Sequence, residues 1–198
     1  MTFEISARGV RFSYEGREVL SGVSFSAGRG IIAIYGENGC GKTTLGKLLA
    51  GILKPSCGTI SAPSRTAFVF QNPNHQLFEE TVWEEVHGLG AVSSAAAERA
   101  LVAMLLHPRR ECASLSYGER KRLAFACGIA SEPALLIADE PFASQDLFGR
   151  QAITKALRRI PSAILLTHNP VSFAAKNMRL HRGKIQGNCG ITQKGERT

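Results

Sequence analysis

Several features that would assign the chain to a membrane or to the cell exterior are missing from the sequence. No apolar run approaches the roughly 18 residues that a membrane-spanning helix needs. The N-terminal stretch MTFEISARGVRF carries scattered charges and lacks the apolar segment of a signal peptide, so none is expected. The five cysteines form no CxxC pair and no cluster with histidine, which argues against a zinc site and favours reduced thiols.

The composition is that of a folded, basic protein. Hydrophobic residues make up 44% of the 198 residues, which is enough for a core and excludes a disordered or collagen-like chain. The formal net charge of +8 suits nucleic acid, an anionic membrane face or an anionic small ligand, and charge alone does not choose among them. From the length we interpret residues 1–198 as one domain, with a short helical lobe at about 80–130.

Hydrophobic patterning predicts an α/β fold with a mostly parallel core sheet. Four apolar runs are continuous rather than alternating, as in parallel strands covered on both faces: 30–34, 67–70, 134–138 and 163–166. Two N-terminal stretches alternate and predict a small antiparallel sheet: 3–14 and 19–25. Helical patterns follow several strands, at 42–53, 95–106, 117–131 and 148–159. The last ten residues are expected to be frayed.

A glycine-rich loop directly follows the first core strand and opens a helix. It fits G-x-x-x-x-G-K-[ST] and is followed by one more threonine: Gly36, Glu37, Asn38, Gly39, Cys40, Gly41, Lys42, Thr43 and Thr44. The glycines let successive backbone N–H groups point at phosphate oxygens, and the helix N-terminus adds partial positive charge. Lys42 is placed to reach the β and γ phosphates, and Thr43 offers a hydroxyl to Mg²⁺. The loop therefore predicts binding of a nucleoside triphosphate.

Two further core strands end in residues suited to phosphate chemistry. Asp139 and Glu140 follow the apolar run ALLIA, and a carboxylate at that edge can hold Mg²⁺ directly or through water. Asp139 suits this role, and Glu140 suits that of a general base toward the attacking water. His168 follows the strand 163–166 and could contact the γ-phosphate, although a histidine there is by itself an ordinary loop residue.

The sequence LSYGE precedes another helix. Ser116 is a plausible N-cap, and Glu119 three residues later would complete a capping box. Taken alone, this pattern indicates only a well-capped helix. Its position, 139 − 116 = 23 residues before Asp139, is what suggests a further role.

Together these motifs resemble the ATP-binding-cassette (ABC) family of ATPases over about residues 3–183. LSYGE is similar to the family's LSGGQ signature, and the stretch 143–146, which ends in Asp146, is similar to its D-loop. By the same resemblance Gln71 is the Q-loop glutamine, His168 the switch histidine, and Tyr14 the aromatic residue that stacks on adenine. Tyr14 and Gln71 taken alone could equally be a strand aromatic and a strand-end amide.

The resemblance implies that two cassettes close head to tail over two ATP molecules. Ser116, Tyr117, Gly118 and Glu119 would then cover the γ-phosphate held by a second ABC ATPase chain, identical or related. Mg²⁺ would be held by Thr43, Gln71 and Asp139, and hydrolysis would use Glu140, His168 and Gln71. Closure would drive movement in a docked membrane subunit.

A narrower resemblance concerns FQNPNHQLF, residues 70–78, which is similar to the ATPases of energy-coupling-factor (ECF) importers of vitamins and transition-metal ions. It implies that Gln76, Leu77 and Phe78 contact a transmembrane coupling subunit, although Leu77 and Phe78 could instead pack the helical lobe. The expected location is the cytoplasmic face of the membrane, with no nucleic acid partner. A soluble cassette acting on nucleic acid or ribosomes is the alternative, and a P-loop kinase would leave LSYGE, Gln71 and His168 unexplained.

The chain also departs from the family pattern. Tyr117 replaces the first signature glycine and could crowd the phosphate, Glu119 replaces the usual glutamine, and Gln145 replaces an apolar D-loop residue. The intervals that flank Gln71 are short, which predicts a trimmed antiparallel sheet and a short helical lobe. Cys40 lies inside the phosphate loop, so alkylation of its thiol is expected to block nucleotide binding.

Overall fold

The strands form two sheets in the computed structural model, which describes residues 5–88, 90 and 92–188. A three-stranded antiparallel sheet has the order β2-β1-β4 and a six-stranded sheet the order β5-β6-β7-β3-β8-β9. The first contains β1 (Ile5–Tyr14), β2 (Arg17–Ala27) and β4 (Cys57–Ser61). The second contains β3 (Gly30–Tyr35), β5 (Thr66–Val69), β6 (Leu135–Asp139), β7 (Ser162–Thr167), β8 (Lys176–His181) and β9 (Lys184–Asn188). All neighbours in the second sheet are parallel except β8 and β9.

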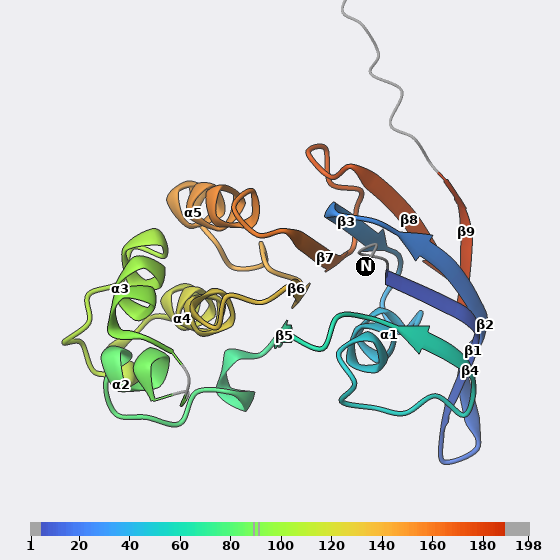
Figure 1. The fold of residues 1–198 in the computed structure, drawn as a ribbon, viewed down its shortest axis with the longest axis horizontal. Coiled ribbons are helices and arrows are strands. Elements are labelled where there is room, and N and C mark those ends of the chain that lie inside the picture. The colour runs from blue at the N-terminus through green and yellow to red at the C-terminus, as the bar shows by residue number, and fades with distance from the viewer. Residues whose placement is uncertain (1–4, 89, 91, 189–198) are drawn as a thin grey trace, which may run out of the picture.

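The helices cover both faces of the six-stranded sheet (Figure 1). On one side α1 (Lys42–Leu49) lies between this sheet and the antiparallel sheet. On the other lie α2 (Val82–His87), α3 (Ser94–Ala103), α4 (Tyr117–Ala130) and α5 (Leu147–Leu157). Two short 3₁₀ turns, Pro73–His75 and Cys112–Ser114, precede α2 and α4.

The four strands β3, β5, β6 and β7 each contribute to two hydrophobic cores, which explains why their sequences are almost entirely apolar. In β6, Leu136 and Ala138 belong to the core under α2–α5, whereas Leu135 and Ile137 belong to the core around α1. All of these side chains are fully buried. A strand buried on both faces cannot show polar alternation, so the predicted parallel sheet is confirmed.

The boundaries and the last strands differ from the sequence prediction. The first helix ends at Leu49 rather than near residue 53, because Gly51 has a φ of 73°, a left-handed conformation that interrupts the helix. Strands β4, β8 and β9 are not among the predicted elements, and β8 and β9 extend the core sheet beyond β3. The frayed segment expected over the last ten residues lies outside the described residues.

The parallel order places four connecting segments at one edge of the sheet. The glycine-rich loop follows β3, Gln71 follows β5, Glu140 follows β6 and His168 follows β7. Carboxyl ends of parallel strands meet at one edge, so residues far apart in sequence converge there. Within the described residues, no helix is long and apolar enough to cross a membrane.

Candidate active site

The glycine-rich loop wraps around the start of α1 in a conformation that requires two of its glycines. Gly41 has a φ of 103°, and a Cβ there would lie 2.7 Å from the Leu20 side chain. A Cβ at Gly36 would collide with the Leu180 carbonyl oxygen. The loop is therefore a backbone cradle, and Gly41, the N-cap of α1, supplies no side-chain cap to the N–H groups of the first turn.

Lys42 lies folded into this cradle with only 7% of its surface exposed. Its Nζ donates hydrogen bonds to the carbonyl oxygens of Gly36, at 2.7 Å, and Glu37, at 2.9 Å. The ammonium is thus held against the loop, next to the start of α1, where no side chain caps the first turn. Ammonium, N–H groups and helix dipole together form an anion site of the kind that holds phosphates.

Thr43 and Asp139 bring a hydroxyl and a carboxylate into contact at the edge of the sheet. Thr43 Oγ1 donates to Asp139 Oδ2 at 2.6 Å. Burial raises the pKa of Asp139, which is 2% exposed, while the hydrogen bond from Thr43 and the charge of Lys42 oppose the rise. Two adjacent oxygen donors, one of them a buried carboxylate, fit the ligand preference of Mg²⁺.

Glu140 occupies a constrained position beside His168. Its φ of 48° is a left-handed conformation that few non-glycine residues adopt. Glu140 Oε1 lies 3.1 Å from His168 Nε2, a contact that becomes an ion pair when the ring is protonated, and this buried oxygen accepts no hydrogen bond from the described residues. Burial raises the pKa of Glu140, and His168 and Lys42 oppose the rise. A buried carboxylate oxygen that no described residue hydrogen-bonds can accept a proton from water.

These residues line one cleft of about 200 Å³. Its walls come from five segments of chain: Val19, Asn38, Gly39, Gly41, Lys42, Thr43, Thr44, Gln71, Asp139, Glu140 and His168. A second hollow of about 520 Å³ shares Val19 and Gly39 with it and is lined by Tyr14 and Cys40. The expected phosphate and aromatic residues are thus side by side. The Glu37 side chain points away, 76% exposed and 4.0 Å from Arg179.

The LSYGE residues lie outside this cleft, at the N-terminus of α4. Ser116 Oγ accepts from the Glu119 N–H and donates to Glu119 Oε2 at 2.8 Å, so the predicted capping box is confirmed. None of Ser116, Tyr117, Gly118 and Glu119 lines either hollow, although the Tyr117 hydroxyl lies 3.5 Å from the Gln71 carbonyl oxygen. Asp146 caps α5 through a 2.7 Å hydrogen bond from the Gly149 N–H and also lies outside the cleft.

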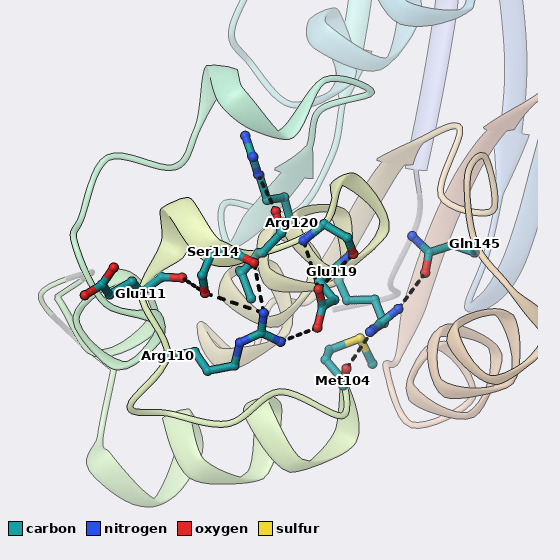
Figure 2. A network of polar contacts seen from close by, with 10 residues as sticks. Met104, Arg110, Glu111, Ser114, Glu119, Arg120 and Gln145 are labelled. Atoms are coloured by element: carbon teal, nitrogen blue, oxygen red, sulfur yellow. Dashed lines mark hydrogen bonds and ion pairs between the residues drawn. The ribbon is translucent and has the colours of Figure 1, made fainter.

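Arginine contacts hold the LSYGE region (Figure 2). Arg110, from the segment before α4, forms an ion pair with Glu119 and donates to the Ser114 carbonyl oxygen. Arg122 joins the Met104 carbonyl oxygen to Gln145 Oε1, and Gln145 Nε2 donates to the Gly118 carbonyl oxygen at 2.9 Å. The start of α4 is therefore tied to the D-loop-like segment 143–146.

Comparison with known proteins agrees with this geometry. The family model described as ABC transporter matches residues 20–143, more than half of the chain. The chain belongs to the ABC transporter family. An aliphatic sulfonates import ATP-binding protein of Paraburkholderia xenovorans is 40% identical over 91% of this chain and 78% of its own length. A putative ABC transporter ATP-binding protein of Pyrococcus horikoshii is 41% identical over 92% of this chain and 82% of its own.

Solved structures show the same fold. The structure of CbiO1 from Clostridium perfringens, part of the ABC transporter complex CbiONQ, has a TM-score of 0.80 at 24% identity and covers 95% of this chain and 88% of its own. A bacterial Atm1-family ABC exporter with ATP bound has a TM-score of 0.85 at 23% identity, over 94% of this chain and 38% of that one. This chain is an ABC ATPase, a family whose members bind and hydrolyse ATP to drive transport, and the kinase interpretation is wrong.

Sequence inspection missed several residues that shape this ABC ATPase. Arg110 and Arg122 carry no local signal, because their partners lie in other segments of the chain. Lys121, next to Arg122, reads as an exposed helix residue but is 4% exposed. Only the helix period, which puts residues 117, 121 and 124 on one face, could have indicated its burial.

Cys40 offers a test of the phosphate loop. The cysteine is half-buried, and its side chain packs toward Gly36 on the inside of the loop. A bulky group on Sγ would therefore displace the backbone that receives the phosphates. Maleimide treatment is expected to weaken ATP binding at least tenfold in the wild type and not in a Cys40→Ala variant, with modified sites mapped by mass spectrometry. Cys57 is exposed and serves as the internal control, since its modification should leave binding intact.

Normal ATP binding by protein fully modified at Cys40 would contradict the expectation. Cys127 should stay unmodified in the folded protein, because burial raises the pKa of its thiol far above the usual range.

Proposed function

We propose that the chain is the ATP-hydrolysing subunit of an ECF-type membrane importer. The observation that supports hydrolysis most directly is the cleft itself, which joins an anion cradle, a hydroxyl–carboxylate pair and a buried carboxylate oxygen that accepts no hydrogen bond from the described residues. The importer assignment is supported by the sulfonate-import relative and by residues 70–78.

Within the cleft, each residue has a proposed part. Lys42 and the loop N–H groups bind the β and γ phosphates, with Asn38, Gly39 and Thr44 completing the wall, and Tyr14 stacks on adenine in the adjoining hollow. Thr43, Asp139 and Gln71 hold Mg²⁺, which would neutralise phosphate charge. Glu140 accepts the proton of the attacking water, and His168 and Gln71 orient the water and the γ-phosphate.

A second ABC ATPase chain completes the site. The residues Ser116–Glu119 lie outside the chain's own cleft, and their helix N-terminus suits a phosphate presented by another molecule. Head-to-tail association would supply that phosphate and add the partner's signature residues to this cleft. The second chain is the same protein or a related cassette.

The surface around residues 76–78 is the proposed contact with a transmembrane coupling subunit. Gln76 is half-buried and holds the segment, since its Oε1 accepts from the Phe70 N–H at 2.8 Å and its Nε2 donates to the Ala124 carbonyl oxygen at 3.3 Å. Leu77 packs on the core under α2–α5. Phe78, by contrast, is 80% exposed, so it is the apolar side chain of the three that is free to enter a partner.

Co-purification from membranes tests the importer proposal. Affinity-tagged chain is expected to recover a polytopic membrane protein together with a cassette chain, and a vitamin- or metal-binding subunit would identify the cargo class. Phe78→Ser should lower recovery of the membrane protein at least fivefold, whereas Ile52→Ser, an apolar residue 49% exposed in the segment after α1, should not. Recovery of ribosomes or nucleic acid without a membrane protein would overturn the importer assignment and leave the ATPase intact.

A further inference from the structure

Lys121 is a buried lysine that touches the hydrolysis site from outside the cleft. It lies one turn into α4 and is 4% exposed. Its Nζ donates a 2.6 Å hydrogen bond to the Glu140 carbonyl oxygen, the one hydrogen bond that this ammonium makes among the described residues. The signature helix therefore reaches the backbone of the proposed base within the same chain.

Burial of the Lys121 ammonium does not by itself favour folding. Burial lowers the pKa of Lys121, because an ammonium removed from water loses its hydration, and the carboxylates of Glu140 and Asp139 oppose this only in part. A single neutral carbonyl does not satisfy three N–H donors. A methionine would fill the same volume without that cost. This indicates that the lysine serves through its hydrogen bond to the Glu140 carbonyl oxygen.

The Glu140 backbone, which Lys121 contacts, has a strained conformation. Glu140 has a φ of 48°, a conformation that persists only where its surroundings impose it. Its N–H donates to the Leu166 carbonyl oxygen at 2.9 Å, which fixes one end to β7. Its carbonyl oxygen accepts from Lys121 and, at 3.2 Å, from the Ala143 N–H. Lys121 is thus the side-chain restraint on this turn.

We propose that Lys121 is a positioning residue for ATP hydrolysis, which fixes the Glu140 peptide and so aims the Glu140 carboxylate into the cleft. The inference rests on the proposed role of Glu140 as the base. The start of α4 makes a second contact with the backbone of the cleft. Tyr117, one turn earlier on the same face, places its hydroxyl 3.5 Å from the Gln71 carbonyl oxygen. One helix face thereby contacts the backbone of two residues of the cleft.

The test compares Lys121→Met with Lys121→Gln, which keeps an N–H donor on a shorter side chain. Steady-state kcat and KM, together with the Kd of a fluorescent ATP analogue, are measured on the purified full-length chain. Lys121→Met is expected to lower kcat at least tenfold with Kd within twofold of wild type, and Lys121→Gln to recover part of the loss. In a Glu140→Gln background, Lys121→Met should change the residual rate less than twofold, because the group it positions is gone.

Cys127→Ala provides the matched control. It is buried on the same helix but contacts the Glu85 carbonyl oxygen instead of the site, so it should lower Tm and leave kcat within twofold. A wild-type kcat in Lys121→Met, an undiminished effect in the Glu140→Gln background, or loss of ATP binding in both Lys121 variants would overturn the inference. Full activity of Glu140→Gln alone would instead overturn the proposed role of Glu140.

Discussion

Replacing Glu140 with glutamine is expected to lower kcat for ATP hydrolysis by about 10²- to 10⁴-fold, the range for loss of a general base. The amide has the same size as the carboxylate but cannot accept the proton of the attacking water. Because the Glu140 side chain makes no hydrogen bond to the phosphate cradle among the described residues, ATP should still bind, with a Kd within threefold of wild type. Single-turnover hydrolysis and nucleotide binding measured on the same protein separate the two quantities.

Glu98→Gln is the control for this substitution. It makes the same chemical change on α3, away from both hollows that hold the proposed nucleotide site, and should leave kcat and Kd unchanged. A Glu140→Gln protein that hydrolyses ATP at the wild-type rate would show that another group accepts the proton. Loss of ATP binding in that variant would place Glu140 in the cradle instead.

Much of this site could be predicted because each of its motifs ends a strand whose position the fold fixes. Continuous apolar runs identify parallel strands, and the carboxyl ends of such strands share one edge. Lys42, Asp139 and His168 could therefore be grouped from sequence, and the structure places them in one cleft. The prediction therefore needs only the order of the motifs along the chain and the rule that parallel strands end at the same edge of their sheet.

The contacts that tune the site could not be predicted in the same way. Glu119 in place of the family's glutamine reads as extra negative charge facing a triphosphate. In the structure, hydrogen bonds from Ser116 and the ion pair with Arg110 lower the pKa of Glu119, so the carboxylate is ionised but already partnered (Figure 2). Arg110 comes from the irregular segment before α4, and no sequence periodicity there predicts that its side chain points toward the helix.

Tyr117 and Lys121 illustrate a second limit of prediction from sequence, which is the direction in which a side chain points. Both are polar residues near a helix start, where sequence reasoning expects solvent or, for Tyr117, crowding of a partner's phosphate. The structure directs both toward the chain's own backbone, at the carbonyl oxygens of Gln71 and Glu140. The helix period places both residues on one face, but whether a lysine on that face is buried depends on the tertiary packing around α4.

Replacing Lys42 with alanine is expected to raise the Kd for ATP by about 10- to 150-fold, which corresponds to the loss of charge-assisted hydrogen bonds worth about 1.5–3 kcal/mol. Two effects act together, because the ammonium supplies the charge at the mouth of the cradle and also ties the Gly36 and Glu37 carbonyl oxygens in place. Lys42→Arg should not restore binding, since a planar guanidinium does not fit the position of a compact, 7% exposed ammonium.

Isothermal titration with ATP and Mg²⁺ measures this prediction, with the exposed Lys54→Ala as a control that removes one positive charge outside the cleft. The control separates a local contact from the general attraction of a basic protein for a polyanion, because the second effect would weaken equally in both variants. A Kd in Lys42→Ala within threefold of that in Lys54→Ala would mean that the loop N–H groups alone bind the phosphates. A separation of tenfold or more would assign the affinity to the ammonium held in the cradle.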